Sequence, residues 1–378
     1  MNAFCRGFVD RFASAARGLC LGALLAAGGA APGWAATVPL PRLGADPVEL
    51  RVAYLVNPRL PRMDAAQLAL LLDAMRSAVR EHFGVQVRFA PIQEVPIAEV
   101  FATIPAQRRA QVLKESYDFK SGRANRAALD RAFAQGFRDS RESLPEMIAF
   151  AQPHTGPIAA NHQDLGRKVA ALQLARVQQW AQRLALDGKP AIDAQPFNEF
   201  PMWLALGFGE LPYELVLTNQ LIAGVEYTFP AVHTAIRGGY SNGITSYGRL
   251  SRFGTFSVWS TYAFTADDDE IVKLRGGERY TPDEAARLAG LSGAHEIGHQ
   301  LFHFTHPFGQ PTCLMSPVPM FAYRAWAAKL SAKDCPISSS PAMTPGQYVF
   351  DYTPEAPSAP PPPGGATSGP AKPVPRLP

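Results

Sequence analysis

The sequence predicts an α/β (α+β) fold, built on a mixed twisted sheet with one long helix that carries the chemically distinctive residues. Three observations predict it: a strand–helix–strand pattern near the start, a mainly helical middle stretch, and apolar strands before a well-capped helix near the end. We expect one domain over residues 37–352, in which the helical stretch, about 97–190, is an insertion. About 315 residues are enough to bury one large core.

The opening pattern predicts a β-α-β unit. Residues 51–57 (RVAYLVN) are apolar and β-branched, and residues 85–90 (VQVRFA) alternate in polarity, so both favour strands. Asp64 can cap the helix between them, and Gly84 can end it. The apolar stripe of that helix comprises Leu68, Leu71, Leu72, Met75, Val79 and Phe83. Strands joined through a helix are expected to pair in parallel.

The later elements follow from the same kinds of signal. We expect helices near 123–140 and 164–187, and strands at 214–218, 232–236 and 255–264. Residues 257–262 are expected to form an exposed edge of the sheet, along which an extended peptide can add as a strand. Thr281, Pro282 and Glu284 carry the signature of a capping box, so a helix should run from there to about His303. A last helix is expected at 320–330.

Both ends of the chain differ from this domain. Residues 1–35 predict a signal peptide, because three arginines precede an apolar run at 18–31 and small residues flank a cut after Ala35. An uncleaved anchor is the alternative, although the run is shorter than the roughly 20 apolar residues of a membrane span. We therefore expect an exported protein, periplasmic or secreted, without an integral membrane segment after cleavage. Residues 353–378 are Pro-rich and predict a disordered tail.

The charge and the cysteine content indicate which kinds of partner and which redox compartment to expect. Without residues 1–35 the chain has 33 basic and 31 acidic residues, a net charge of +2, which is not the pattern of a nucleic-acid-binding protein. The mature chain keeps two cysteines, Cys313 and Cys335. In an oxidising compartment they favour one disulfide, and two buried thiols are the alternative.

The residues most indicative of function form an HExxH motif at His295 to His299. Residues four apart share one face of a helix, so His295 and His299 can bind one zinc ion. Glu296 lies beside them, where it can take a proton from a water molecule. Four of the eight histidines in the chain fall within residues 295–306, which favours a metal site over chance.

His303 and His306 are the candidates for the third ligand. On a continuous helix His303 would lie about 12 Å along the axis from His295, too far to share one ion. Pro307 disfavours helix at the residue before it, so the helix should break near 304–305 and let His306 return to the metal. We therefore prefer His306, and expect His303 to support a ligand, contact substrate or only end the helix.

The stretch HEIGHQLFHFTH at 295–306, with Cys313-Leu314-Met315 downstream, resembles the metzincin zinc peptidases, whose pattern is HExxHxxGxxH followed by a Met-turn. It is most similar to the archaemetzincin branch, which has Cys-x-Met shortly after its third histidine. The resemblance implies a zincin-like metallopeptidase domain with one catalytic Zn²⁺. It assigns the metal ligands to His295, His299 and His306, the general base to Glu296, and the Met-turn residue to Met315.

The chain also departs from the family pattern. Phe302 stands at the position of the metzincin glycine, Thr305 stands where the third histidine is expected, and His306 comes one residue late. Archaemetzincins carry further cysteines for a second, structural zinc. This chain has only Cys313 and Cys335 there, so a disulfide is expected instead.

These residues predict an exported zinc metalloendopeptidase that acts on a peptide or protein substrate. One alternative is a non-catalytic zinc-binding or protein-binding module on a zincin scaffold, motivated by the displaced histidine and the missing glycine. A second is a gluzincin-type enzyme with an acidic third ligand, but the acidic residues after His299 are not in a helical motif. A third is a polar helix with incidental histidines.

Overall fold

The computed structural model describes residues 40–41, 43, 47–115, 117, 125–140, 142–192, 196–225, 231–304 and 306–336. All of them belong to the unit Thr37–Tyr352. The predicted signal peptide (1–35) and the predicted Pro-rich tail (353–378) lie outside the described residues, as does Thr305. Within the described part, every helix is too short or too polar to cross a lipid bilayer.

A mixed five-stranded sheet lies at the centre, in the order β4-β2-β5-β7-β6. Its strands are β2 (Val52–Val56), β4 (Gln93–Pro96), β5 (Leu215–Thr218), β6 (Gly243–Tyr247) and β7 (Thr255–Ser260). All neighbours pair in parallel except β6, which is antiparallel to β7. A second, two-stranded parallel sheet joins β1 (Val48–Leu50) to β3 (Val87–Phe89). The predicted α/β class and the parallel pairing of the opening unit are thus confirmed.

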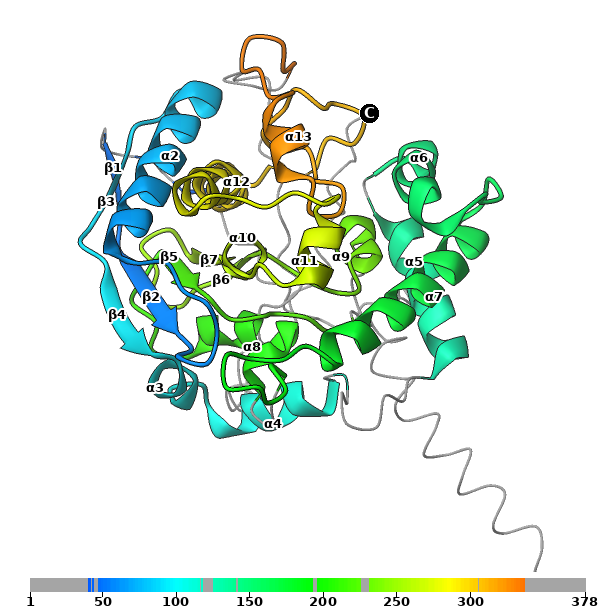
Figure 1. Cartoon of the computed structure of the whole chain (residues 1–378), viewed down its shortest axis with the longest axis horizontal. Coiled ribbons are helices and arrows are strands. Elements are labelled where there is room, and N and C mark those ends of the chain that lie inside the picture. Colours follow the sequence, from blue (N-terminus) through cyan, green and yellow to red (C-terminus); the bar gives the residue numbers. More distant parts are fainter. Residues whose placement is uncertain are drawn as a thin grey trace, which may run out of the picture. The chain divides into compact units, whose positions relative to one another are not determined.

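Helices cover both faces of the central sheet (Figure 1). On one face lie α2 (Ala65–Phe83) and α12 (Pro282–Phe302); on the other lie α3 (Ile97–Ala102), α4 (Ala106–Glu115) and α8 (Phe200–Ala205). Strand β2 shows the consequence: Tyr54 packs into the core under α2 and α12, whereas Ala53 and Leu55 belong to the opposite core. A strand buried on both faces is apolar throughout, as β2 is.

The later part of the predicted helical stretch, residues 126–181, forms a group beside the sheet, on the right of Figure 1, whereas α3 and α4 cover the sheet itself. It contains α5 (Arg126–Asp139), α6 (Leu144–Thr155) and α7 (His162–Ala181), which confirms the two helices predicted there, with shifted ends. Asn125, Ser143 and Asn161 cap these helices through their side chains. Both α6 and α7 pack against α9 (Val232–Ile236). Two short 3₁₀ turns, η1 (Pro196–Asn198) and η2 (Leu206–Phe208), flank α8.

Two sequence predictions about strands were wrong. Residues 232–236 form helix α9 rather than a strand, and Gly238 and Gly239 end it with left-handed backbones (φ 77° and 72°). A five-residue segment is too short for its periodicity to separate helix from strand. Residues 257–262 are not an edge either, because β7 lies between β5 and β6 and is buried throughout. The edge strand on this side of the sheet is β6, and the other edge strand is β4.

The segment after β7 leads into the long helix through α10 (Tyr262–Thr265) and α11 (Asp269–Leu274). Thr281 caps α12, accepting the backbone N–H of Glu284, as predicted. The Glu284 side chain does not complete the capping box, because it forms an ion pair with Arg324 instead. The last helix, α13 (Tyr323–Ala327), is shorter than the predicted 320–330, and Met320 before it has a left-handed backbone (φ 49°).

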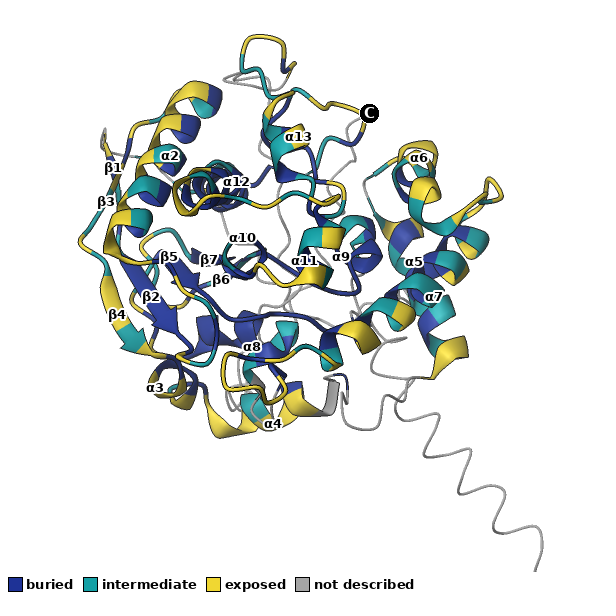
Figure 2. Ribbon diagram, viewed as in Figure 1, coloured by how far each residue is buried: buried dark blue, intermediate teal, exposed yellow. Residues whose placement is uncertain are grey.

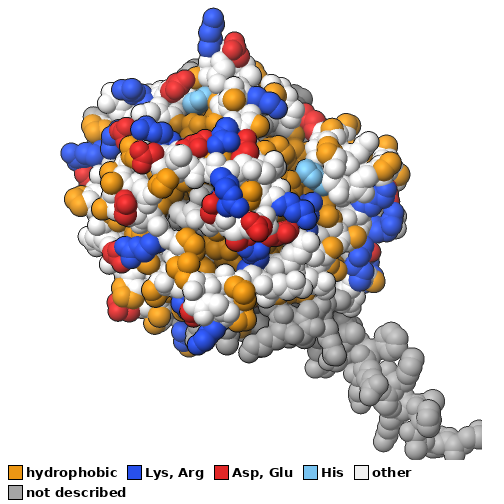
Figure 3. Space-filling model, in the orientation of Figure 1, with side chains coloured by type: hydrophobic (Ala, Val, Ile, Leu, Met, Phe, Trp, Pro, Cys, Tyr) orange, Lys and Arg blue, Asp and Glu red, His pale blue; other side chains and the backbone are white. Residues whose placement is uncertain are grey.

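Helix α12 is buried along most of its length, which places polar side chains in the interior (Figure 2). Gly290 permits this burial, because a Cβ atom there would lie 2.1 Å from the carbonyl oxygen of Leu71 on α2. The two helices can therefore cross at close range. On the face drawn in Figure 3, charged side chains of both signs are interspersed rather than gathered into one patch.

Candidate metal centre

Two histidines of α12 form the first part of the site. His295 and His299 lie one helical turn apart on the same face, and their Nε2 atoms are 3.0 Å from each other. Both side chains are buried. The two imidazoles thus converge on one point, as the spacing in the sequence predicts.

The third histidine arrives through a bend at the end of the helix. Helix α12 ends at Phe302, and His303 takes a left-handed backbone (φ 54°) as its C-cap. The chain then turns back, so that the Nε2 atoms of His306 and His299 are 3.2 Å apart. The candidate ligand atoms of His295, His299 and His306 all lie within 4.8 Å of one another. His303 is buried but does not belong to this group.

Each of the three rings has an oxygen atom near its other nitrogen. The Nδ1 of His295 is 2.9 Å from the carbonyl oxygen of Leu314, and the Nδ1 of His299 faces the carbonyl oxygen of Phe304. A carbonyl oxygen only accepts, so both Nδ1 atoms donate a proton and both Nε2 atoms present a lone pair. The Nδ1 of His306 lies 3.7 Å from a carboxylate oxygen of Glu142.

The rings are held in the neutral state that metal binding requires. Burial lowers the pKa of His299 to about 3 and that of His306 to about 4. Burial also lowers the pKa of His295 well below its ordinary value. Neutral Nε2 lone pairs that face one another repel unless a cation lies between them. The arrangement therefore favours a bound cation.

The spacing of the nitrogens fits a small tetrahedral metal ion. Two nitrogen ligands about 2.1 Å from a tetrahedral zinc ion lie about 3.4 Å from each other. The two Nε2 separations that involve His299, 3.0 and 3.2 Å, are close to this value, and the three ligand atoms lie within 4.8 Å of one another. Imidazole suits zinc, copper, iron and nickel, so the three-histidine group can bind a metal ion without its chemistry alone fixing which one.

Glu296 lies beside the histidines and is held from the sheet. Thr245 of β6 donates a hydrogen bond of 2.9 Å to its Oε2. The backbone of Gly243 presses against the same carboxylate, since a Cβ atom there would lie 2.0 Å from Oε1. Burial raises the pKa of Glu296 to about 7, against the opposing effects of the Thr245 hydrogen bond and the positive charge of Arg237. A carboxyl group in this state can both accept and return a proton.

Arg237 supplies a buried positive charge near Glu296 and His306, with only 7% of its surface exposed. Its guanidinium donates to the carbonyl oxygen of His233 and approaches the side-chain oxygen of Asn242. The ring of His233 in turn contacts the ring of His306, with centroids 4.3 Å apart. Its positive charge acts on the site, where it adds to the effect of burial in lowering the pKa of His306 and opposes the rise in the pKa of Glu296.

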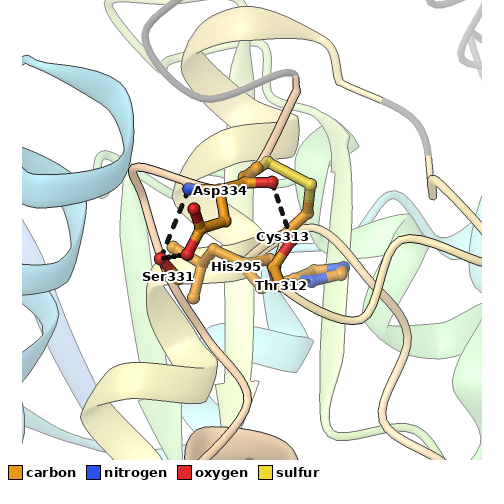
Figure 4. The surroundings of a disulfide bond; sticks show 7 residues. His295, Thr312, Cys313, Ser331 and Asp334 are labelled. Carbon is orange, nitrogen blue, oxygen red and sulfur yellow. Dashed lines mark hydrogen bonds between the residues drawn. A yellow bond between two sulfur atoms is a disulfide. The ribbon is translucent and has the colours of Figure 1, made fainter.

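Met315 and the disulfide lie in the segment that follows the metal-site helix and contacts it. A Cβ atom on Gly298 would lie 2.3 Å from the Met315 sulfur, so this methionine packs against the helix between the two histidine turns. Cys313 and Cys335 are at bonding distance, with their sulfurs 2.11 Å apart. Figure 4 shows this pair next to His295, with Ser331 and Asp334 hydrogen-bonded beneath it.

The sequence did not point to every residue that shapes the site. Gly243 and Thr245 come from an unpredicted strand, Arg237 follows an unpredicted helix, and Glu142 comes from the helical stretch outside the resembling region. Only the pairing of strands and the packing of helices bring them to the histidines. Comparisons with models of protein families, with curated proteins and with solved structures found no match for this chain.

Proposed function

We propose that the protein is a zinc-dependent peptidase of metzincin type, exported from the cell, that hydrolyses peptide bonds. One observation carries the proposal: three neutral imidazoles converge on one point, with a buried carboxylate beside them. His295, His299 and His306 would hold the zinc ion through Nε2. The disulfide between Cys313 and Cys335 supports export, because such bonds persist in oxidising compartments.

The displaced third histidine supports the metzincin assignment once the backbone is considered. In HExxHxxGxxH the third histidine follows the glycine by three residues. Here His303 takes the left-handed backbone in place of the glycine, one residue later than the pattern, and His306 follows it by three. The whole bend is thus shifted by one residue. Histidine is among the non-glycine residues enriched in this conformation.

The chemistry follows from where the charges lie. When bound, zinc supplies Lewis acidity that makes water acidic and polarises the substrate carbonyl. Glu296 takes the proton of the attacking water and passes it to the leaving nitrogen, with its carboxylate held by Thr245. Arg237 adds a fixed positive charge on the side of His306, which favours the negative charge that develops on the carbonyl oxygen.

The substrate would bind along β6 rather than β7. Among the described strands, β6 pairs only with β7, so its other edge can accept an extended chain. The same strand carries Thr245, which contacts Glu296. A peptide added there would bring a backbone carbonyl next to the catalytic carboxylate.

A direct test is hydrolysis of an unfolded protein substrate by the zinc-loaded protein, with and without a chelator. Glu296→Gln is the matched control, because it keeps the shape of the side chain and removes the base. Cleavage by the wild type that stops with chelator and in Glu296→Gln supports the proposal. Zinc binding without cleavage of any peptide would instead support a non-catalytic module.

A further inference from the structure

The three histidines of the metal site differ in what holds their second nitrogen. His295 and His299 face backbone carbonyl oxygens, which are neutral and are supplied by the segment that follows the helix. His306 faces Glu142, a carboxylate, with Nδ1 and Oε1 3.7 Å apart. Both side chains of this pair are largely buried, 16% and 17% exposed. Among the described residues, the third histidine thus has an ionisable side chain next to its Nδ1.

Glu142 has a fixed position of its own. It lies between α5 and α6, where the hydroxyl of Ser140 accepts its backbone N–H at 3.1 Å. Ser140 also forms a hydrogen bond with the Glu142 side chain. The carboxylate is therefore oriented before any metal binds.

Further contacts hold the His306 segment against α6. The rings of Phe308 and Phe150 meet edge to face with centroids 5.0 Å apart. A Cβ atom on Gly309 would lie 3.4 Å from the carboxylate of Glu146, so the backbone passes close to this helix. The helical stretch thus supports the loop that delivers the third histidine, as well as providing Glu142.

We propose that Glu142 is a positioning residue for the metal site, which accepts the Nδ1 proton of His306 and aims its Nε2 at the bound ion. The proposal rests on the proposed function in that the ion is zinc. Under this proposal the helical stretch contributes a side chain to the metal site and is not a separate module. Loss of a carboxylate that holds a metal-bound histidine in this way commonly lowers metal affinity about 10- to 100-fold. We expect an effect of about this size for Glu142.

The charge of Glu142 has a second effect. A divalent ion among three neutral imidazoles, with Arg237 nearby, leaves an excess of positive charge in a buried pocket. Burial raises the pKa of Glu142 to about 8, and a divalent ion held by His306 would favour the ionised form again. The ionised carboxylate would then offset part of this excess and raise the basicity of the ligand. The amide of Glu142→Gln keeps a hydrogen-bond acceptor but removes the charge, so the two contributions can be separated.

The test compares the full-length wild type with Glu142→Gln, Glu142→Ala and the control Glu146→Gln. Glu146 lies on α6, four residues after Glu142 and beside the same loop, and among the described residues no ion pair joins it to His306. The dissociation constant for zinc is measured by competition with a chelator. We expect it to rise about 10- to 100-fold in Glu142→Ala, less in Glu142→Gln, and not in Glu146→Gln.

A merely structural role would give a different result. It would lower the melting temperature of the metal-free protein in Glu142→Gln, whereas a positioning role lowers only the increase in melting temperature that zinc produces. The absorption spectrum of the cobalt-substituted protein should shift in Glu142→Gln, because the orientation and basicity of a ligand change. Unchanged zinc affinity and an unchanged cobalt spectrum in both Glu142 variants would overturn the proposal.

Zinc affinity of the Glu142 variants and peptide cleavage by the wild type give separate results. If the wild type binds zinc and cleaves peptides while Glu142→Ala binds zinc equally well, only the role of Glu142 is refuted. If zinc affinity falls in Glu142→Ala but the wild type cleaves nothing, Glu142 holds the metal in a protein that is not a peptidase. If the wild type binds no zinc, both are refuted.

Discussion

The Nδ1 nitrogen of His295 lies 2.9 Å from the carbonyl oxygen of Leu314. This hydrogen bond joins the metal-site helix to the turn that carries Met315. Leu314 directly follows Cys313, and the disulfide with Cys335 anchors that turn to the segment after α13. The orientation of the first histidine therefore depends on a covalent bond outside the helix. Zinc affinity should consequently respond to the oxidation state of these cysteines.

Replacing both Cys313 and Cys335 by alanine should lower the free energy of unfolding by about 3 kcal/mol, as expected for a loop of this length. Zinc affinity should fall as well, because the acceptor of His295 is less constrained. Denaturant unfolding and zinc competition measure the two effects. Peptide mass mapping without reductant should find the two cysteines joined, and free thiols on exported protein would rule the bridge out.

Gly243→Ala should impair catalysis and spare metal binding. The added methyl group would lie 2.0 Å from Oε1 of Glu296, so the carboxylate must move. A displacement of about 1 Å in a catalytic group can cost about 100-fold in turnover. Steady-state kinetics and zinc content measure the result, and wild-type turnover in this variant would exclude the position of Glu296 as a determinant of rate.

Glu296→Gln should keep one zinc per chain and lose at least about 100-fold in hydrolysis, because the amide cannot accept the proton of the attacking water. The amide of Glu296→Gln has the same shape, so it can keep its contact with the hydroxyl of Thr245. Metal analysis and peptide cleavage are measured on the same preparation. Turnover equal to that of the wild type would remove Glu296 as the general base.

The stability of the fold should depend on pH through Glu214. Burial favours the protonated form of this carboxyl group, but hydrogen bonds from Arg51 and Arg252 outweigh burial and lower its pKa below the ordinary value of 4.5. The ionised group therefore contributes stability above about pH 4.5, and this contribution is lost as pH falls through the folded pKa. Urea unfolding between pH 3 and 6 should show a smaller loss in Glu214→Gln than in the wild type. Parallel profiles would contradict this role.

Much of the fold follows from local signals in the sequence. Asp64 and Gly84 bound α2 as predicted, because a side-chain cap and a left-handed glycine are encoded within a few residues. The register of β6 could not be predicted in this way. Gly243 and Thr245 lie in a short segment, and the pairing with β7 defines them as part of a strand.

Some residues of the site could likewise be predicted from local sequence signals, and others could not. His295, Glu296 and His299 share one helical turn, so helix periodicity alone brings them together. Pro307 indicated that the helix must end before His306, but the left-handed backbone of His303 is a property of the folded bend. Glu142 and Arg237 approach His306 from segments that are far from it in the sequence. Such contacts depend on tertiary packing, which no local pattern records.

Zinc per chain is the measurement that tests the metal centre most directly, made on the wild type beside His306→Ala and His303→Ala. The wild type should hold one zinc, His303→Ala should keep it, and His306→Ala should lose it, because only His306 joins the other two histidines. Retention of zinc by His306→Ala together with its loss from His303→Ala would reassign the third ligand. A wild type without zinc under metal-replete conditions would contradict the metallopeptidase proposal altogether.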